Sequence, residues 1–147
     1  MAEATLYDRD YYAWTQDQAA RLRRLAGERA NLDLDLENLA EEVESMGASD
    51  LREVESDLAN VLAHLLKLEL SPARDLRDHW RAEIGLWRGK IALLLDQSPS
   101  LRGRLRSDRA WNLARRVAAL SLKADGLGKR DLPTACPYDL GVALSDD

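Results

Sequence analysis

Apolar residues between positions 51 and 68 recur at alternating steps of three and four, and no other feature of the chain constrains its fold as strongly. The residues of this stripe are Leu51, Val54, Leu58, Val61, Leu65 and Leu68. Such steps place side chains on one face of an α-helix packed in a bundle. Similar spacing recurs through almost the whole chain, and no second segment could pair with a β-strand. The sequence therefore predicts an all-α fold.

The length of the chain, 147 residues, fits one compact domain. The spacing predicts five helices, at about residues 8–29, 33–46, 50–70, 75–97 and 99–125. Residues 132–147 contain two prolines and are expected to form a short irregular tail. Because the connections are short, neighbouring helices should run antiparallel. We expect residues 1–147 to fold as a single domain, a four- to five-helix and mostly antiparallel bundle.

Gly47 is expected to separate the second predicted helix from the third. Glycine fits the left-handed position after a helix end, and Ser49 fits the N-cap of the helix that follows. A turn this short would fold residues 33–46 and 50–70 into a helical hairpin. The inward stripe of the first arm would then consist of Leu32, Leu36, Leu39, Val43 and Met46.

The composition argues against several classes of protein. A single cysteine, Cys136, cannot form an intrachain disulfide and fits a reducing compartment. No apolar run approaches the roughly 20 residues of a membrane helix, and no secretory signal is visible. No phosphate-binding glycine loop or nucleophile elbow occurs. We expect a cytoplasmic protein without membrane contact, without a cofactor and without an identifiable catalytic residue, which argues against an enzyme.

Acidic and basic residues are concentrated in different parts of the chain, although the net charge is only −5. Acids dominate from Asp33 to Asp57, and bases dominate from Arg102 to Arg130. Three interpretations stay open: solvated faces that meet within the fold or between chains, an acidic hairpin that binds a basic protein, and a last helix that binds nucleic acid. The acidic total and the lack of a helix-turn-helix or stacking pattern argue against nucleic acid.

The two histidines each belong to a polar row. Asp75, His79 and Glu83 share one helical face, which suits either a metal ion or a salt-bridged surface row. The Glu-x-x-His signature of di-iron bundles is absent, so no metal site is predicted. In the expected hairpin, His64 and Asn60 would lie opposite Asp33 and Glu37. A carboxylate-paired histidine could act as a general base or bind a ligand, or it could only fix the register of the hairpin.

With these residues in view, the chain resembles the bacterial family known as domain of unknown function 29. The resemblance rests on the following ordered motifs: Leu6-Tyr7-Asp8, Tyr11-Tyr12-Ala13-Trp14, the signature Asp35-Leu36-Glu37-Asn38-Leu39-Ala40-Glu41-Glu42-Val43-Glu44-Ser45-Met46-Gly47, His64-Leu65-Leu66-Lys67, Trp80-Arg81, Ser98-Pro99-Ser100-Leu101 and Cys136-Pro137-Tyr138. At Trp87-Arg88 the family commonly has a Gln-Arg pair. The resemblance implies an all-helical fold and carries no established activity, cofactor or catalytic residue.

These observations favour a small helical interaction module that acts through a protein partner or through self-association, with the acidic hairpin as its surface. The alternative is a ligand-binding or enzymatic bundle with a polar site around Glu37 and His64. Nucleic-acid binding by the basic last helix is a second alternative. The candidate binding residues are Asp33, Glu37, Asn38, Glu41, Glu44, Asn60 and His64.

Overall fold

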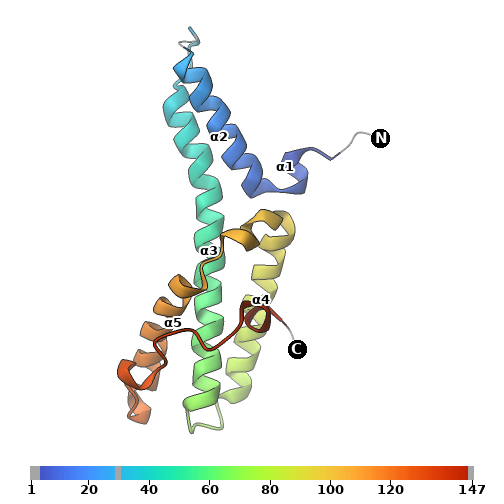
Figure 1. The fold of residues 1–147 in the computed structure, drawn as a ribbon. Coiled ribbons are helices and arrows are strands. Elements are labelled where there is room, and N and C mark those ends of the chain that lie inside the picture. The colour runs from blue at the N-terminus through green and yellow to red at the C-terminus, as the bar shows by residue number, and fades with distance from the viewer. Residues whose placement is uncertain (1–3, 29–30, 146–147) are drawn as a thin grey trace. The chain divides into compact units, whose positions relative to one another are not determined.

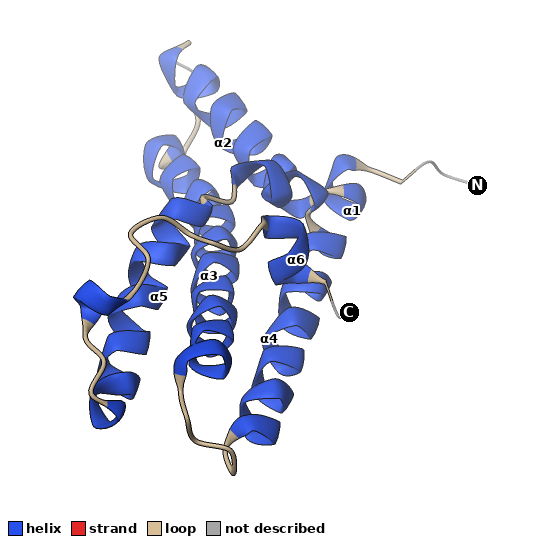
Figure 2. Ribbon diagram, turned by 60° about the horizontal axis from the view of Figure 1, so that its bottom comes forward, coloured by secondary structure: helices blue, strands red, loops and turns tan. Residues whose placement is uncertain are grey.

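The structure, a computed structural model, describes residues 4–28 and 31–145, and all its regular elements are helices (Figure 1). The α-helices are α1 (Leu6–Arg9), α2 (Tyr11–Gly27), α3 (Leu36–Leu70), α4 (Arg77–Gln97), α5 (Ser107–Ser121) and α6 (Leu140–Leu144). Three short 3-10 helices are η1 (Pro99–Arg104), η2 (Leu122–Asp125) and η3 (Lys129–Asp131). Within these described residues there is no strand (Figure 2), and the prediction of an all-α fold is confirmed.

The chain divides into two compact units that share α3. The first unit comprises Met1–Glu53 and Leu94–Arg104, and the second comprises Val54–Leu93 and Leu105–Asp147. In the first unit, α2 runs antiparallel to the first half of α3 (Figure 1). In the second unit, α4 runs antiparallel to the second half of α3. Each unit is therefore built on its own half of one helix.

Gly47 lies inside α3, and the turn predicted there is wrong. One helix spans Leu36–Leu70, so residues 33–46 and 50–70 do not form a hairpin. The glycine is needed for close packing instead. A Cβ atom at Gly47 would lie 2.1 Å from Oγ1 of Thr15 and 3.2 Å from the ring of Tyr12, both on α2. Thr15 is fully buried, and its hydroxyl donates to the Tyr12 carbonyl at 2.7 Å. The absence of a side chain at Gly47 therefore lets α2 and α3 approach each other.

Asp10 connects the start of α2 to η1 in the first unit. One carboxylate oxygen accepts from the amide of Ala13 at 3.0 Å, which caps the helix. The same carboxylate accepts from the amide and the hydroxyl of Ser100 at 2.9 and 2.8 Å. Close by, the amide of Tyr12 donates to the buried hydroxyl of Ser98 at 2.9 Å. The first helix predicted from residue 8 is thus divided at Asp10 into α1 and α2.

The core of the second unit follows part of the spacing expected from the sequence, while Leu62 and Leu66 are buried in place of Leu65 and Leu68. On α3, Val54, Leu58 and Val61 are fully buried. The inward residues of α4 and α5 include Trp80, Ile84, Ile91, Trp111, Ala114 and Ala118. The indole nitrogen of Trp111 donates to the carbonyls of Pro133 and Thr134, which holds the segment after η3 against α5. The last predicted helix, 99–125, is divided into η1, α5 and η2.

Replacing Gly47 with alanine should destabilise the protein by roughly 1–3 kcal/mol, because the new methyl group would overlap the Thr15 side chain. Urea denaturation followed by circular dichroism measures this loss. The matched control is Gly85→Ala on α4, where a Cβ would meet nothing within 4 Å. That change should stabilise α4 by roughly 0.5–1 kcal/mol. Equal effects of the two changes would contradict the packing role of Gly47.

Candidate functional sites

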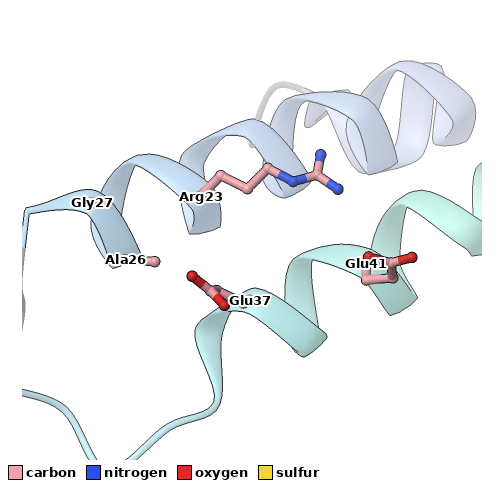
Figure 3. A pocket seen from close by; sticks show the side chains of 5 residues that line it. All are labelled: Arg23, Ala26, Gly27, Glu37 and Glu41. Carbon is pink, nitrogen blue, oxygen red and sulfur yellow. The ribbon is translucent and has the colours of Figure 1, made fainter.

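Four of the predicted site residues lie along the first half of α3, beside α2. Glu37 and Glu41 line a pocket of about 350 Å³ together with Arg23, Ala26 and Gly27 of α2 (Figure 3). Glu44 forms an ion pair with Arg23. Asn38 donates its side-chain amide to Asp35 at 2.6 Å, where the Asp35 carboxylate also accepts from the Asn38 backbone amide and caps α3.

The pocket between α2 and α3 is lined by charged side chains, none of which is buried. Glu37 and Glu41 are exposed, and the Arg23 guanidinium is already paired with Glu44. Asp33, also predicted to belong to the site, is exposed before the start of α3. The pocket can therefore attract a cationic group, but it has no buried acid or base.

Asn60 and His64 lie in the second unit, on the second half of α3. Because α3 is continuous, the hairpin that was expected to bring them to Asp33 and Glu37 does not form. The partner of His64 is Glu83 of α4, at 2.5 Å from Nε2 to Oε2. The other oxygen of Glu83 lies 3.1 Å from Nε2 of His79. The sequence pattern grouped Glu83 with His79, but it gave no sign that His64 would join them across two helices.

One aromatic ring packs against the buried histidine, and a second packs against the lysine one turn further along α3. The His64 ring meets Trp87 edge to face, with centroids 4.7 Å apart and an interplanar angle of 80°. One turn along α3, the Lys67 ammonium lies 4.8 Å from the ring centroid of Trp80. The aromatic ring of Trp87 on α4 thus packs against His64 on α3. The cluster joins α3 to α4 through both polar and aromatic contacts.

Burial lowers the pKa of His64 below its ordinary value of 6.5, and the charge of Lys67 acts in the same direction. The Glu83 carboxylate and the Asn60 backbone favour the protonated ring, but they do not outweigh burial. Burial also lowers the pKa of Lys67. With Nε2 of His64 bonded to Glu83, the ring nitrogen left for a general base is Nδ1, and this atom is buried away from solvent. The arrangement is that of an interhelical contact.

In the part of the chain that the structure describes, no three histidine, cysteine, aspartate or glutamate side chains form a group that could hold a metal ion. Nor is any of the described helices long and apolar enough to cross a membrane.

A different feature, missed from the sequence, lies on the outer face of α3. Leu39 and Met46 were predicted to point inward, but their side chains are 41% and 49% exposed. The inward positions are Leu36, Ala40, Val43 and Gly47, which continue the register of the buried Val54, Leu58 and Val61 in the second half of α3. The predicted break at Gly47 hid this continuity. Reading one register through the whole helix would have placed Leu39 and Met46 outside.

Leu39 and Met46 alternate with polar residues in an exposed row that we term the acidic stripe. Its members are Leu39, Glu42, Met46, Ser49 and Glu53, which recur at steps of three and four. Neither Glu42 nor Glu53 forms an ion pair within residues 4–28 and 31–145. At the inner edge of the stripe, burial and the charge of Glu53 raise the pKa of Asp50. The stripe therefore carries negative charge beside exposed apolar side chains.

Three aromatic rings lie together in the first unit near Asp50. Trp14 stacks on Tyr11 at 5.9 Å between centroids and meets Tyr7 edge to face at 4.9 Å. Burial raises the pKa of Tyr11, and the carboxylate of Asp50 raises it further. Tyr7 is more than half exposed. Aromatic and methionine side chains are enriched in protein interfaces, so this cluster extends the apolar surface next to the acidic residues.

The fold and these features define an all-helical protein with an exposed acidic and apolar helix face. The chain belongs to the family described as Domain of unknown function DUF29, whose model matches residues 6–147. It is similar to an alpha-helical protein of unknown function from Rhodospirillum rubrum that is known from a crystal structure. The two are 32% identical with a TM-score of 0.81, over 99% of this chain and 92% of that chain. No curated protein matches the chain.

The stability of the protein should fall as the pH drops below about 6.5, because the unfolded chain then binds a proton that buried His64 resists. The loss should continue until the pH reaches the lowered pKa of the folded state. Urea denaturation between pH 7 and pH 5 measures it. His64→Gln should reduce this dependence, whereas His79→Gln retains His64 and should keep it. A His64→Gln variant with the unaltered pH dependence would contradict the direction assigned to His64.

Proposed function

We propose that this protein is an interaction module and that the acidic stripe on α3 binds a basic, amphipathic helix of a partner protein. The observation that supports this most directly is the exposure of Leu39 and Met46 on either side of Glu42. Apolar anchors at helical spacing are the pattern with which one helix recognises another. Carboxylates beside these anchors would select a partner with lysine or arginine at matching positions.

Binding would be favourable because it would bury the apolar side chains of the acidic stripe, which are exposed in the free protein. Fully burying a leucine or methionine side chain is worth roughly 1.5–3 kcal/mol. Glu42 and Glu53 have no ion pair in the described chain, so a cationic partner would not have to displace an existing one. Their charges would also speed association at low ionic strength.

A binding role fits the polar groups better than a chemical role does. The Nε2 atom of His64 is bonded to Glu83, its Nδ1 atom is buried away from solvent, and the carboxylates of the pocket beside α2 are exposed. The lone Cys136 fits a reducing environment, so we place the module in the cytoplasm of a bacterium. The pocket lined by Glu37 and Glu41 is the runner-up site, and it would accept a cationic ligand.

A fluorescently labelled synthetic helix with leucine and arginine at alternating steps of three and four should bind the protein, as measured by fluorescence anisotropy. Glu42→Arg and Met46→Ser should each weaken binding about tenfold or more, because they remove a charge partner and an apolar anchor from the acidic stripe.

The control for charge is Asp96→Arg, which makes the same charge change at an exposed position of α4 outside the acidic stripe and should change binding little. A scrambled peptide of equal charge controls for non-specific attraction. Equal loss with Asp96→Arg and Glu42→Arg, or equal binding of the scrambled peptide, would show that only the net charge of the protein matters.

A further inference from the structure

The outward face of α5, in the second unit, carries a second exposed row that neither the fold nor the proposed function uses. We term it the basic stripe, and its members are Arg109, Leu113, Arg116, Leu120 and Lys123, the last of which lies in η2. Leu113 is 43% exposed and Leu120 is 73% exposed. The inward face of the same helix is formed by Ala110, Trp111, Ala114 and Ala118. The leucines of the basic stripe therefore lie opposite the core and face solvent.

Two of the three cations of the basic stripe are available for a partner. Arg116 and Lys123 form no ion pair within the described residues, whereas Arg109 lies 3.7 Å from a carboxylate oxygen of the buried Glu55. Arginines of the same region outside the stripe are engaged. Arg106 pairs with Asp108 at 2.9 Å, and Arg115 donates to the carbonyl of Lys129 at 3.2 Å. The basic stripe thus combines available cations with exposed leucines.

The two stripes have the same spacing and opposite charge. In the acidic stripe, Glu42 has Leu39 three residues before it and Met46 four residues after it. In the basic stripe, Arg116 has Leu113 three residues before it and Leu120 four residues after it. If Glu42 lies opposite Arg116, the four apolar side chains fall level with one another in parallel helices. In antiparallel helices they differ by one residue, a rise of about 1.5 Å.

The second unit has a further exposed apolar row on α4, and it differs from the basic stripe in the charges that it offers to a partner. On α4, Leu86 and Leu93 are 63% and 74% exposed, with Lys90 between them. The Lys90 ammonium lies 3.6 Å from a carboxylate oxygen of the buried Asp57, so it already faces an acid of its own unit. The α4 row therefore suits the acidic stripe less well than the basic stripe does.

We propose that the partner of the acidic stripe is a second copy of this chain, which binds through its basic stripe. This inference rests on the proposed function and names its partner. The contact joins two different surfaces, so each copy presents one donor and one acceptor surface. Such an interface closes into a ring, the smallest being a dimer with two equivalent contacts, or it continues into a chain of copies.

Sedimentation equilibrium of the full chain should show reversible self-association that weakens as salt is added. Glu42→Arg and Arg116→Glu should each weaken association about tenfold or more, because each variant opposes two like charges. An equimolar mixture of the two variants should regain association. In the mixture, the arginine introduced into one variant meets the glutamate introduced into the other, while the native pair of Glu42 and Arg116 forms in the second contact. The double variant E42R/R116E should also associate by itself.

Leu86→Ser is the matched control for an exposed leucine outside both stripes, and Asp96→Arg, at an exposed position of α4, is the control for charge; both should associate like the unaltered chain. Restoration in the mixture and in the double variant is a result that misfolding cannot produce. A chain that stays monomeric but whose acidic stripe binds the synthetic basic helix would overturn self-association and leave the proposed function intact. A chain that neither self-associates nor binds that helix would overturn both. Association unchanged by Arg116→Glu, or a basic stripe that binds duplex DNA while the chain stays monomeric, would also overturn this inference.

Discussion

The close contact between Gly47 and Thr15 is the constraint on which the first unit depends, because it fixes the face of α3 that meets α2. A Cβ atom at Gly47 would overlap the Thr15 hydroxyl, so no other residue fits without moving a helix. Once this face is fixed, Leu36, Ala40 and Val43 point inward as well. Leu39 and Met46 are then left in solvent. The surface proposed to bind a partner is thus a consequence of how two helices pack on the opposite side.

The apolar stripe of residues 51–68 predicted the middle of the buried face correctly, since Val54, Leu58 and Val61 are buried. It was wrong further along, where Leu62 and Leu66 lie in the core and Leu65 and Leu68 are only partly buried. The continuity of α3 through Gly47 was not predictable in the same way. A glycine without a Cβ suits both a left-handed helix end and a close helix crossing, and only the position of α2 distinguishes the two. The predicted helix end at Gly47 caused the error in register, because a new helix that begins near Ser49 need not bury the same face as the helix before it. The acidic and basic segments were evident from composition, but their alternation with exposed leucines was not.

In the candidate sites, too, contacts within one helix were predictable from the sequence, and contacts between helices were not. Contacts within a helix, such as that of Glu83 with His79, follow from spacing along the sequence. The pairing of His64 with Glu83 depends on which helix packs beside the second half of α3, and spacing does not encode this. Glu37 and Glu41 were singled out by the family signature, and they do share a pocket, but the basic residue that lines it with them is Arg23 of α2, which pairs with Glu44, and not a histidine. A prediction of tertiary neighbours was needed in each case where the sequence failed.

The bonds from Asp10 and Tyr12 to Ser100 and Ser98 have a consequence for the order in which the protein can fold. The first unit consists of two segments of the chain. Between them in the sequence lies the hairpin that the second half of α3 forms with α4 in the second unit. During synthesis, the start of α2 leaves the ribosome long before η1 exists. The amide of Tyr12 and the Asp10 carboxylate can bond to Ser98 and Ser100 only after about ninety further residues have been synthesised. Closing so long a loop is slow. The second half of α3 and α4 make contacts that are closer in sequence, and we expect this hairpin to form before the first unit closes.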